Sequence, residues 1–137
     1  MGKRNVKVIA LDTNIITRYL VGDVESQFTE SINMFKRAEL GEIRLLILPV
    51  VVAEVTYVLQ SFYHKSAADI SDAMGTFLVQ PWFELEHEKA LLGMWSWYEQ
   101  GNHFVDSYLL ALNKFENIEL FSFDKKLNKM VEKKGES

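Results

Sequence analysis

Short apolar segments alternate along this chain with longer stretches of helical periodicity, and this alternation limits the folds open to it. Four segments have the length and composition of strands. They are residues 7–11 (KVIAL), 44–48 (RLLIL), 82–85 (WFEL) and 119–123 (ELFSF). Strands that alternate with helices in this way indicate a parallel sheet covered by helices. The sequence therefore predicts an α/β fold, specifically a three-layer α/β/α sandwich with a short parallel sheet.

The stretches between these segments carry apolar residues at helical spacing, with start and stop signals at their ends. Pro49 suits the first turn of a helix, Gly41 suits the end of one, and Asn102 suits a cap. Helices are expected over about residues 14–20, 25–40, 49–63, 66–79, 88–100, 103–115 and 124–132. With 137 residues and no visible linker or repeat, the chain is expected to form one domain over residues 1–137.

The composition excludes several classes of site and of protein. The chain has no cysteine, so disulfides, thiolate metal sites and cysteine nucleophiles are ruled out. No apolar run approaches the roughly 18 residues of a membrane span, and the apolar stretch near the start is too short for a signal peptide. We therefore expect a cytoplasmic protein with no membrane partner. The net charge of −4 means that any binding of nucleic acid must be local, because a general binder would be basic.

Four of the 19 acidic residues stand in apolar surroundings. Asp12 and Asp124 each follow a strand candidate, and sites in parallel sheets form at the carboxyl ends of strands. Glu54 and Asp106 lie in helical stretches, with no basic residue except His103 within four positions. Local ion pairing therefore cannot neutralise them. A buried ionised carboxylate is costly without a partner, so helix amides, a cationic side chain or a metal ion should compensate these four.

Each acid also has an ordinary structural interpretation. Asp12 and Asp124 could cap the helices that follow them, and Glu54 and Asp106 could lie on the wet edges of amphipathic helices. The alternative is a shared site, in which Mg²⁺ or Mn²⁺ relieves the repulsion between converging carboxylates. Such an ion can polarise a phosphodiester and activate a water for in-line attack. Without cysteine a zinc site is disfavoured, and His103 is a weak candidate for a ligand or proton carrier.

Taken in order, these motifs resemble those of the PIN-domain nucleases, and among them the VapC-type toxins of prokaryotic toxin–antitoxin pairs. The matching pieces are Asp12-Thr13-Asn14 after the opening strand, Glu54 in the helix after the second strand, VDSYLLAL around Asp106, and SFD around Asp124. The resemblance spans residues 8–127, which is nearly the whole chain. The region 66–100 carries no family signature.

The resemblance implies a metal-dependent endoribonuclease that leaves a 5′-phosphate and a 3′-hydroxyl. Asp12, Asp106 and Asp124 would bind Mg²⁺ or Mn²⁺ directly or through water, and Glu54 would complete the site and orient or deprotonate the attacking water. Two further positions match polar residues that support the site in relatives: Asn14 and Ser122. The implied partners are an RNA substrate, a small antitoxin whose basic tail enters the acidic pocket, and a second copy in a homodimer.

Two surface features bear on RNA binding. The aromatic residues Trp82, Phe83, Trp95, Trp97 and Tyr98 could stack on unpaired bases, but packing in the core or an interface is the preferred interpretation. Lysines at positions 125, 126, 129, 133 and 134 could contact RNA phosphates near Asp124. A solvated helix face explains these lysines equally well.

Three other functions compete with a toxin. The first is a PIN nuclease that serves RNA processing. The second is a non-catalytic domain that uses its acidic pocket to bind a basic peptide, and the full set of carboxylates argues against it. The third is a receiver-type phosphotransfer domain, which needs a phosphoacceptor Asp at a strand end in mid-chain. Neither the strand before Pro49 nor the strand after Pro81 offers such an Asp.

Overall fold

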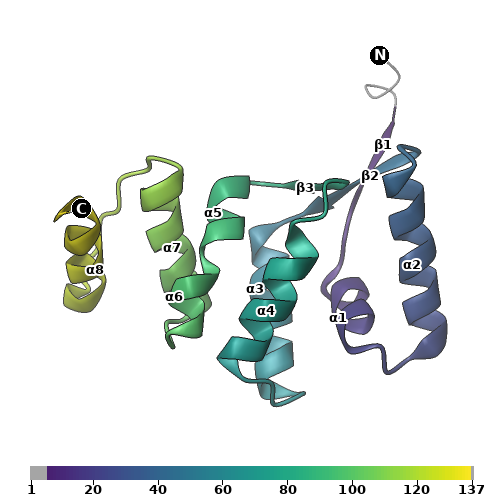
Figure 1. Ribbon diagram of the computed structural model, residues 1–137, viewed down its shortest axis with the longest axis horizontal. Coiled ribbons are helices and arrows are strands. Elements are labelled where there is room, and N and C mark those ends of the chain that lie inside the picture. Colours follow the sequence, from purple (N-terminus) through teal and green to yellow (C-terminus); the bar gives the residue numbers. More distant parts are fainter. Residues whose placement is uncertain (1–5, 137) are drawn as a thin grey trace. The chain divides into compact units, whose positions relative to one another are not determined.

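The computed structural model describes residues 6–136, with side chains described for residues 6–131. The chain divides into two compact units, the first ending at Glu86 and the second beginning at His87. The elements of the first unit, labelled in Figure 1, are β1 (Lys7–Ala10), α1 (Thr13–Val21), α2 (Glu25–Glu39), β2 (Ile43–Ile47), α3 (Pro49–Ser61), α4 (Ala67–Leu78) and β3 (Phe83–Leu85). Those of the second unit are α5 (Glu88–Gly93), α6 (Trp95–Glu99), α7 (Phe104–Phe115) and α8 (Lys125–Glu136).

The three strands of the first unit form one parallel sheet in the order β1-β2-β3. Ala10 pairs with Leu46, and Leu45 pairs with Phe83. The strand β2 lies in the middle, and its alternate residues Ile43 and Ile47 are buried together with Leu45. Helices and a short, open parallel sheet confirm the predicted α/β class, in agreement with a PIN-like α/β/α fold.

The core of the first unit consists of apolar side chains from the sheet and from the helices that pack on it. Ile16 of α1 and Val55 of α3 are fully buried, and α1 packs on both α2 and α3. Phe35, Phe77 and Phe83 bring α2, α4 and β3 together, with ring centroids 4.8–5.9 Å apart. Aromatic rings at these separations add edge-to-face attraction to the hydrophobic effect. The core thus holds the strand ends in place.

The second unit is helical in the residues described, and its centre is the contact between α5 and α7. Leu91 and Leu110 are buried there. Gly93, the last residue of α5, makes this close approach possible. A β-carbon built at Gly93 would lie 2.5 Å from the ring of Phe115, which no side chain larger than hydrogen can do without displacing the ring.

Most of the predicted elements are present, but three predictions are wrong. Residues 119–123 form no strand and are irregular, and Phe121 and Phe123 are 85% and 90% exposed. The expected helix over 88–100 is two short helices that meet at Met94. Asn102 does not cap α7, because its side-chain amide donates to the carbonyl of Trp97 at 2.8 Å, and His103 takes the cap position.

The preferred interpretation of the aromatic residues is confirmed where the structure decides it. Phe83, Trp95 and Tyr98 are at most 6% exposed. Their rings therefore pack in the core of their own units and are not available for stacking on bases.

Candidate functional site

Asp12 lies at the start of α1, immediately beyond the carboxyl end of β1. Leu11, between them, extends the strand pairing because its N–H donates to the carbonyl of Leu46 at 3.0 Å. Oδ1 of Asp12 accepts the Thr13 N–H at 2.6 Å, so the residue is the N-cap of α1. An ionised carboxylate has about four acceptor sites on two oxygens, so this bond leaves Oδ2 for another ligand. Asn14 lies exposed in the first turn of the same helix.

Glu54 lies on α3, which begins with Pro49 directly after β2. Its neighbour Val55 is fully buried, whereas Glu54 itself is exposed. The side chain therefore lies on the solvent side of a mostly apolar helix, as the structural interpretation expected. Since β1 and β2 are adjacent and parallel, α1 and α3 both start at the same edge of the sheet. The first unit thus brings Asp12 and the helix of Glu54 to one edge.

Asp106 occupies the first turn of α7 in the second unit and is half-buried. A carboxylate in the first turn interacts favourably with the helix dipole. The neighbouring Ser107 is fully buried and donates its hydroxyl proton to the carbonyl of His103 at 2.9 Å. The His103 side chain is exposed.

Asp124 is held in a local network at the start of α8. Its backbone N–H donates to the Ser122 hydroxyl at 2.9 Å, and its Oδ1 accepts the Leu127 N–H at 3.0 Å. Ser122, predicted as a supporting position, therefore contacts the residue that it was expected to support. The sequence reasoning missed Asn128, whose amide donates to the Ser122 carbonyl at 2.9 Å. An Asn in the first turn of the helix after SFD is the signal that could have found it.

None of the four acids takes part in an ion pair in the part of the chain that the structure describes; the acids paired there are Asp23, Glu42 and Glu84. Inside either unit, as far as its residues are described, no group of three or more His, Asp or Glu side chains could hold a metal ion. Each unit supplies two of the four acids.

The hydrogen bonds of Asp12 and Asp124 confirm their structural roles as helix caps. All four acids are accessible to solvent to some degree.

The fold places the protein among the parallel α/β proteins. Asp12 lies at the carboxyl end of the first strand, which is where sites form in such sheets. Comparison with family models makes the class specific: the model described as PIN domain matches residues 9–133. The match covers most of the chain and all four acids, so the chain belongs to the PIN-domain family. Comparison with curated proteins and with solved structures gives no match.

Family membership supports a general activity. PIN domains are generally nucleases that use divalent metal ions, which supports a hydrolase acting on nucleic acid. None of the helices described here combines the length and apolar character that a membrane crossing requires.

Proposed function

We propose that this protein is a Mg²⁺- or Mn²⁺-dependent endoribonuclease whose acidic site consists of Asp12, Glu54, Asp106 and Asp124. The observation that carries the proposal is the PIN-domain match over residues 9–133, because it includes the four acids in the order noted from the sequence. RNA as the substrate, and cleavage within the strand, follow from the resemblance to the VapC-type members of the family.

The donor set fits a hard divalent cation. All four side chains offer carboxylate oxygens, the ligands that Mg²⁺ and Mn²⁺ prefer. The cap bonds of Asp12 and Asp124 each use Oδ1, so one oxygen of each is left for the ion. A bound ion would supply charge stabilisation of the phosphodiester and a more acidic water. The proposal requires the two units to bring their pairs of acids together in the active molecule.

Within this proposal, each residue has a stated task. Asp12, Asp106 and Asp124 hold the ion directly or through water, and Glu54 orients or deprotonates the attacking water. Ser122 fixes the backbone at Asp124, and Asn14 supports the site from the first turn of α1.

The biological role that we propose is that of a toxin in the cytoplasm, controlled by a small antitoxin. An acidic site open to solvent attracts a basic peptide, so an antitoxin tail with Arg or Lys can block it. We also propose a homodimer, which light scattering of the purified protein would test. The competing role, RNA processing without an antitoxin, uses the same chemistry.

One experiment tests the nuclease assignment, and a second separates the two roles. Purified protein is incubated with mixed cellular RNA in Mg²⁺ or in chelator, and the new ends are sequenced. We expect cleavage with 5′-phosphate ends in Mg²⁺ only; equal cleavage in chelator would refute the metal-dependent activity. In cells, expression alone should stop growth, and co-expression with the neighbouring small reading frame should restore it. Harmless expression of active protein would favour RNA processing.

A further inference from the structure

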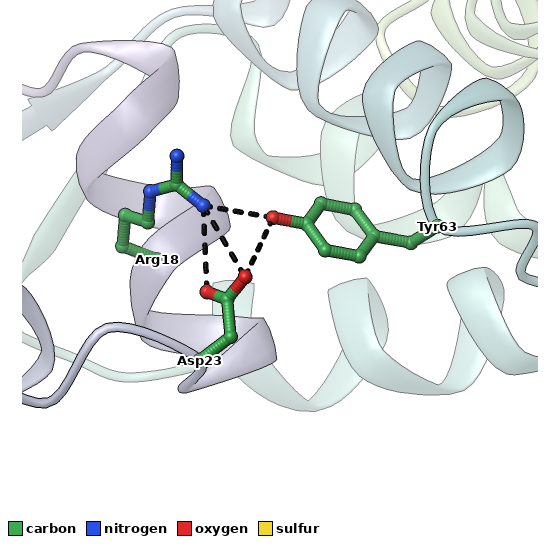
Figure 2. Close-up of polar contacts among 3 residues, drawn as sticks. All are labelled: Arg18, Asp23 and Tyr63. Atoms are coloured by element: carbon green, nitrogen blue, oxygen red, sulfur yellow. Dashed lines mark hydrogen bonds and ion pairs between the residues drawn. The ribbon is translucent and has the colours of Figure 1, made fainter.

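A polar network that belongs to no predicted motif joins the ends of two helices of the first unit. Figure 2 shows its three members, Arg18, Asp23 and Tyr63, pointing toward one another. Nη1 of Arg18 donates to the Tyr63 hydroxyl at 2.8 Å and lies 3.4 Å from Oδ1 of Asp23. The Tyr63 hydroxyl in turn donates to Oδ2 of Asp23 at 3.1 Å. The phenol both accepts and donates, so it is the link between the two charged groups.

Each member is fixed to its own helix by the backbone. Arg18 lies in the last turn of α1, and its carbonyl accepts the N–H of Gly22 at 2.8 Å, where a left-handed residue (φ 70°) ends the helix and places Asp23. Tyr63 lies just beyond α3, and its N–H donates to the carbonyl of Val58 at 3.3 Å. The network therefore ties the end of α1 to the end of α3.

The same two helices are also held together at their beginnings. They follow β1 and β2, whose pairing continues through the bond from Leu11 to Leu46. Asp12 caps α1 at this edge, and Glu54 lies on α3. With one attachment at the sheet edge and another at the polar network, the angle between α1 and α3 is determined at both ends.

The network fixes the orientation of the two helices more than it adds to the stability of the fold. The side chains of Arg18 and Asp23 are 32% and 43% exposed, and ion pairs of that exposure stabilise a fold little. The packing of buried Ile16 and Val55 already holds the helices together, but apolar contact is not directional, whereas hydrogen bonds are.

The distance along α1 turns a small change of angle into a large displacement. Asp12 precedes Arg18 by six residues, which is about 9 Å along the axis at about 1.5 Å per residue. A rotation of about 5° around the network would move the Asp12 end by about 0.8 Å relative to α3. In a formed metal site, the distance from the ion to each ligand atom stays within about 0.2 Å of its usual value.

We infer that Tyr63, with Arg18 and Asp23, is a positioning residue that sets Asp12 relative to Glu54 for binding of the divalent ion. The inference rests on the proposed function. According to this inference, the affinity for the metal ion depends on these three residues as well as on the four acids.

The test is Tyr63→Phe, which removes only the hydroxyl. The matched control is Tyr57→Phe, because Tyr57 lies on α3 and is 63% exposed. Mn²⁺ binding is measured by calorimetry, and the Mg²⁺ concentration for half-maximal cleavage is measured in parallel. We expect Tyr63→Phe to weaken Mn²⁺ binding by about tenfold and to raise the half-saturating Mg²⁺ equally, with cleavage recovering in excess metal. The control should match wild type.

A second pair of variants keeps the test decisive if Tyr63→Phe folds poorly. Oδ2 of Asp23 accepts from both partners, from Arg18 at 3.5 Å and from Tyr63 at 3.1 Å. Asp23→Asn can keep one oxygen at that position and should retain most of the metal affinity, whereas Asp23→Ala should lose it as Tyr63→Phe does. Asp12→Asn separates this inference from the proposed function. If Asp12→Asn binds Mn²⁺ like wild type, the acidic site itself is wrong. If Asp12→Asn weakens binding but Tyr63→Phe and Asp23→Ala do not, the positioning role is overturned.

Discussion

The backbone N–H of Asp124 donates to the hydroxyl of Ser122 over 2.9 Å, and this bond fixes the turn that leads into α8. The turn is closed again by Asn128, whose amide donates to the Ser122 carbonyl. Ser122 therefore holds the N–H of Asp124 and is itself held by Asn128, while the Asp124 carboxylate caps the helix through Oδ1.

This arrangement predicts that Ser122→Ala lowers cleavage by about tenfold, because Asp124 loses the partner that orients its backbone. Ser122→Thr should keep most of the activity, since threonine retains the hydroxyl. Cleavage rates at saturating Mg²⁺ for the two variants provide the measurement. Equal rates for alanine, threonine and wild type would remove Ser122 from the supporting positions.

Substitution of Asp12 should separate its cap from its proposed metal role. Asparagine caps a helix about as well as aspartate, whereas alanine costs about 1 kcal/mol. We expect Asp12→Asn to melt near wild type and Asp12→Ala to melt lower, with cleavage falling by several powers of ten in both. Thermal melts and cleavage assays on the same preparations check this. An active asparagine variant would reduce Asp12 to a cap.

Asp106 offers a test of whether the four acids share one site. If they converge without metal, their repulsion destabilises the fold, and Asp106→Asn should raise stability in EDTA by an amount on the order of 1 kcal/mol. Saturating Mg²⁺ should then stabilise wild type more than the variant. A purely structural Asp106, in the first turn of α7, would predict the reverse, because the variant loses its favourable interaction with the helix dipole. Melts in EDTA and in Mg²⁺ at equal ionic strength distinguish these outcomes.

Two helical glycines, Gly93 and Gly75, should respond in opposite directions to alanine. A β-carbon at Gly93 meets the Phe115 ring at 2.5 Å, so Gly93→Ala should destabilise the second unit by about 1–3 kcal/mol. Nothing lies within 4 Å of a β-carbon at Gly75 in α4, so Gly75→Ala should stabilise by about 0.5–1 kcal/mol. Urea unfolding curves of both variants give the comparison, and a neutral Gly93→Ala would contradict the close contact of α5 with α7.

The sequence predicts the elements of the first unit well because their signals are local. Pro49 starts α3, Gly41 follows α2 with φ of 80°, and Ser66 caps α4 through the N–H of Asp69. Local signals fail for residues 119–123, because a strand also needs a partner with free backbone groups. The apolar alternation around Phe121 and Phe123 is real, but the described sheet contains only β1, β2 and β3.

In the candidate site, too, the features set by neighbouring residues could be predicted and those that depend on distant residues could not. Asp12 and Asp124 could be located from the sequence because each follows an apolar segment, and their caps obey a rule that involves one to three residues. The network of Arg18, Asp23 and Tyr63 could not be foreseen. Tyr63 lies 45 positions from Arg18, and no spacing rule connects a residue after one helix to the last turn of another.

The position of the sheet early in the chain has a consequence for synthesis. Every strand of the described sheet ends by Leu85, so the whole of this sheet is synthesised before α5. Domains fold from the N-terminus as the ribosome releases them, so the first unit can assemble on the nascent chain. Asp106 and Asp124 are added afterwards. A protein that cleaves RNA by the proposed site would thus gain the last two of its four acids only in the final part of its synthesis on the ribosome.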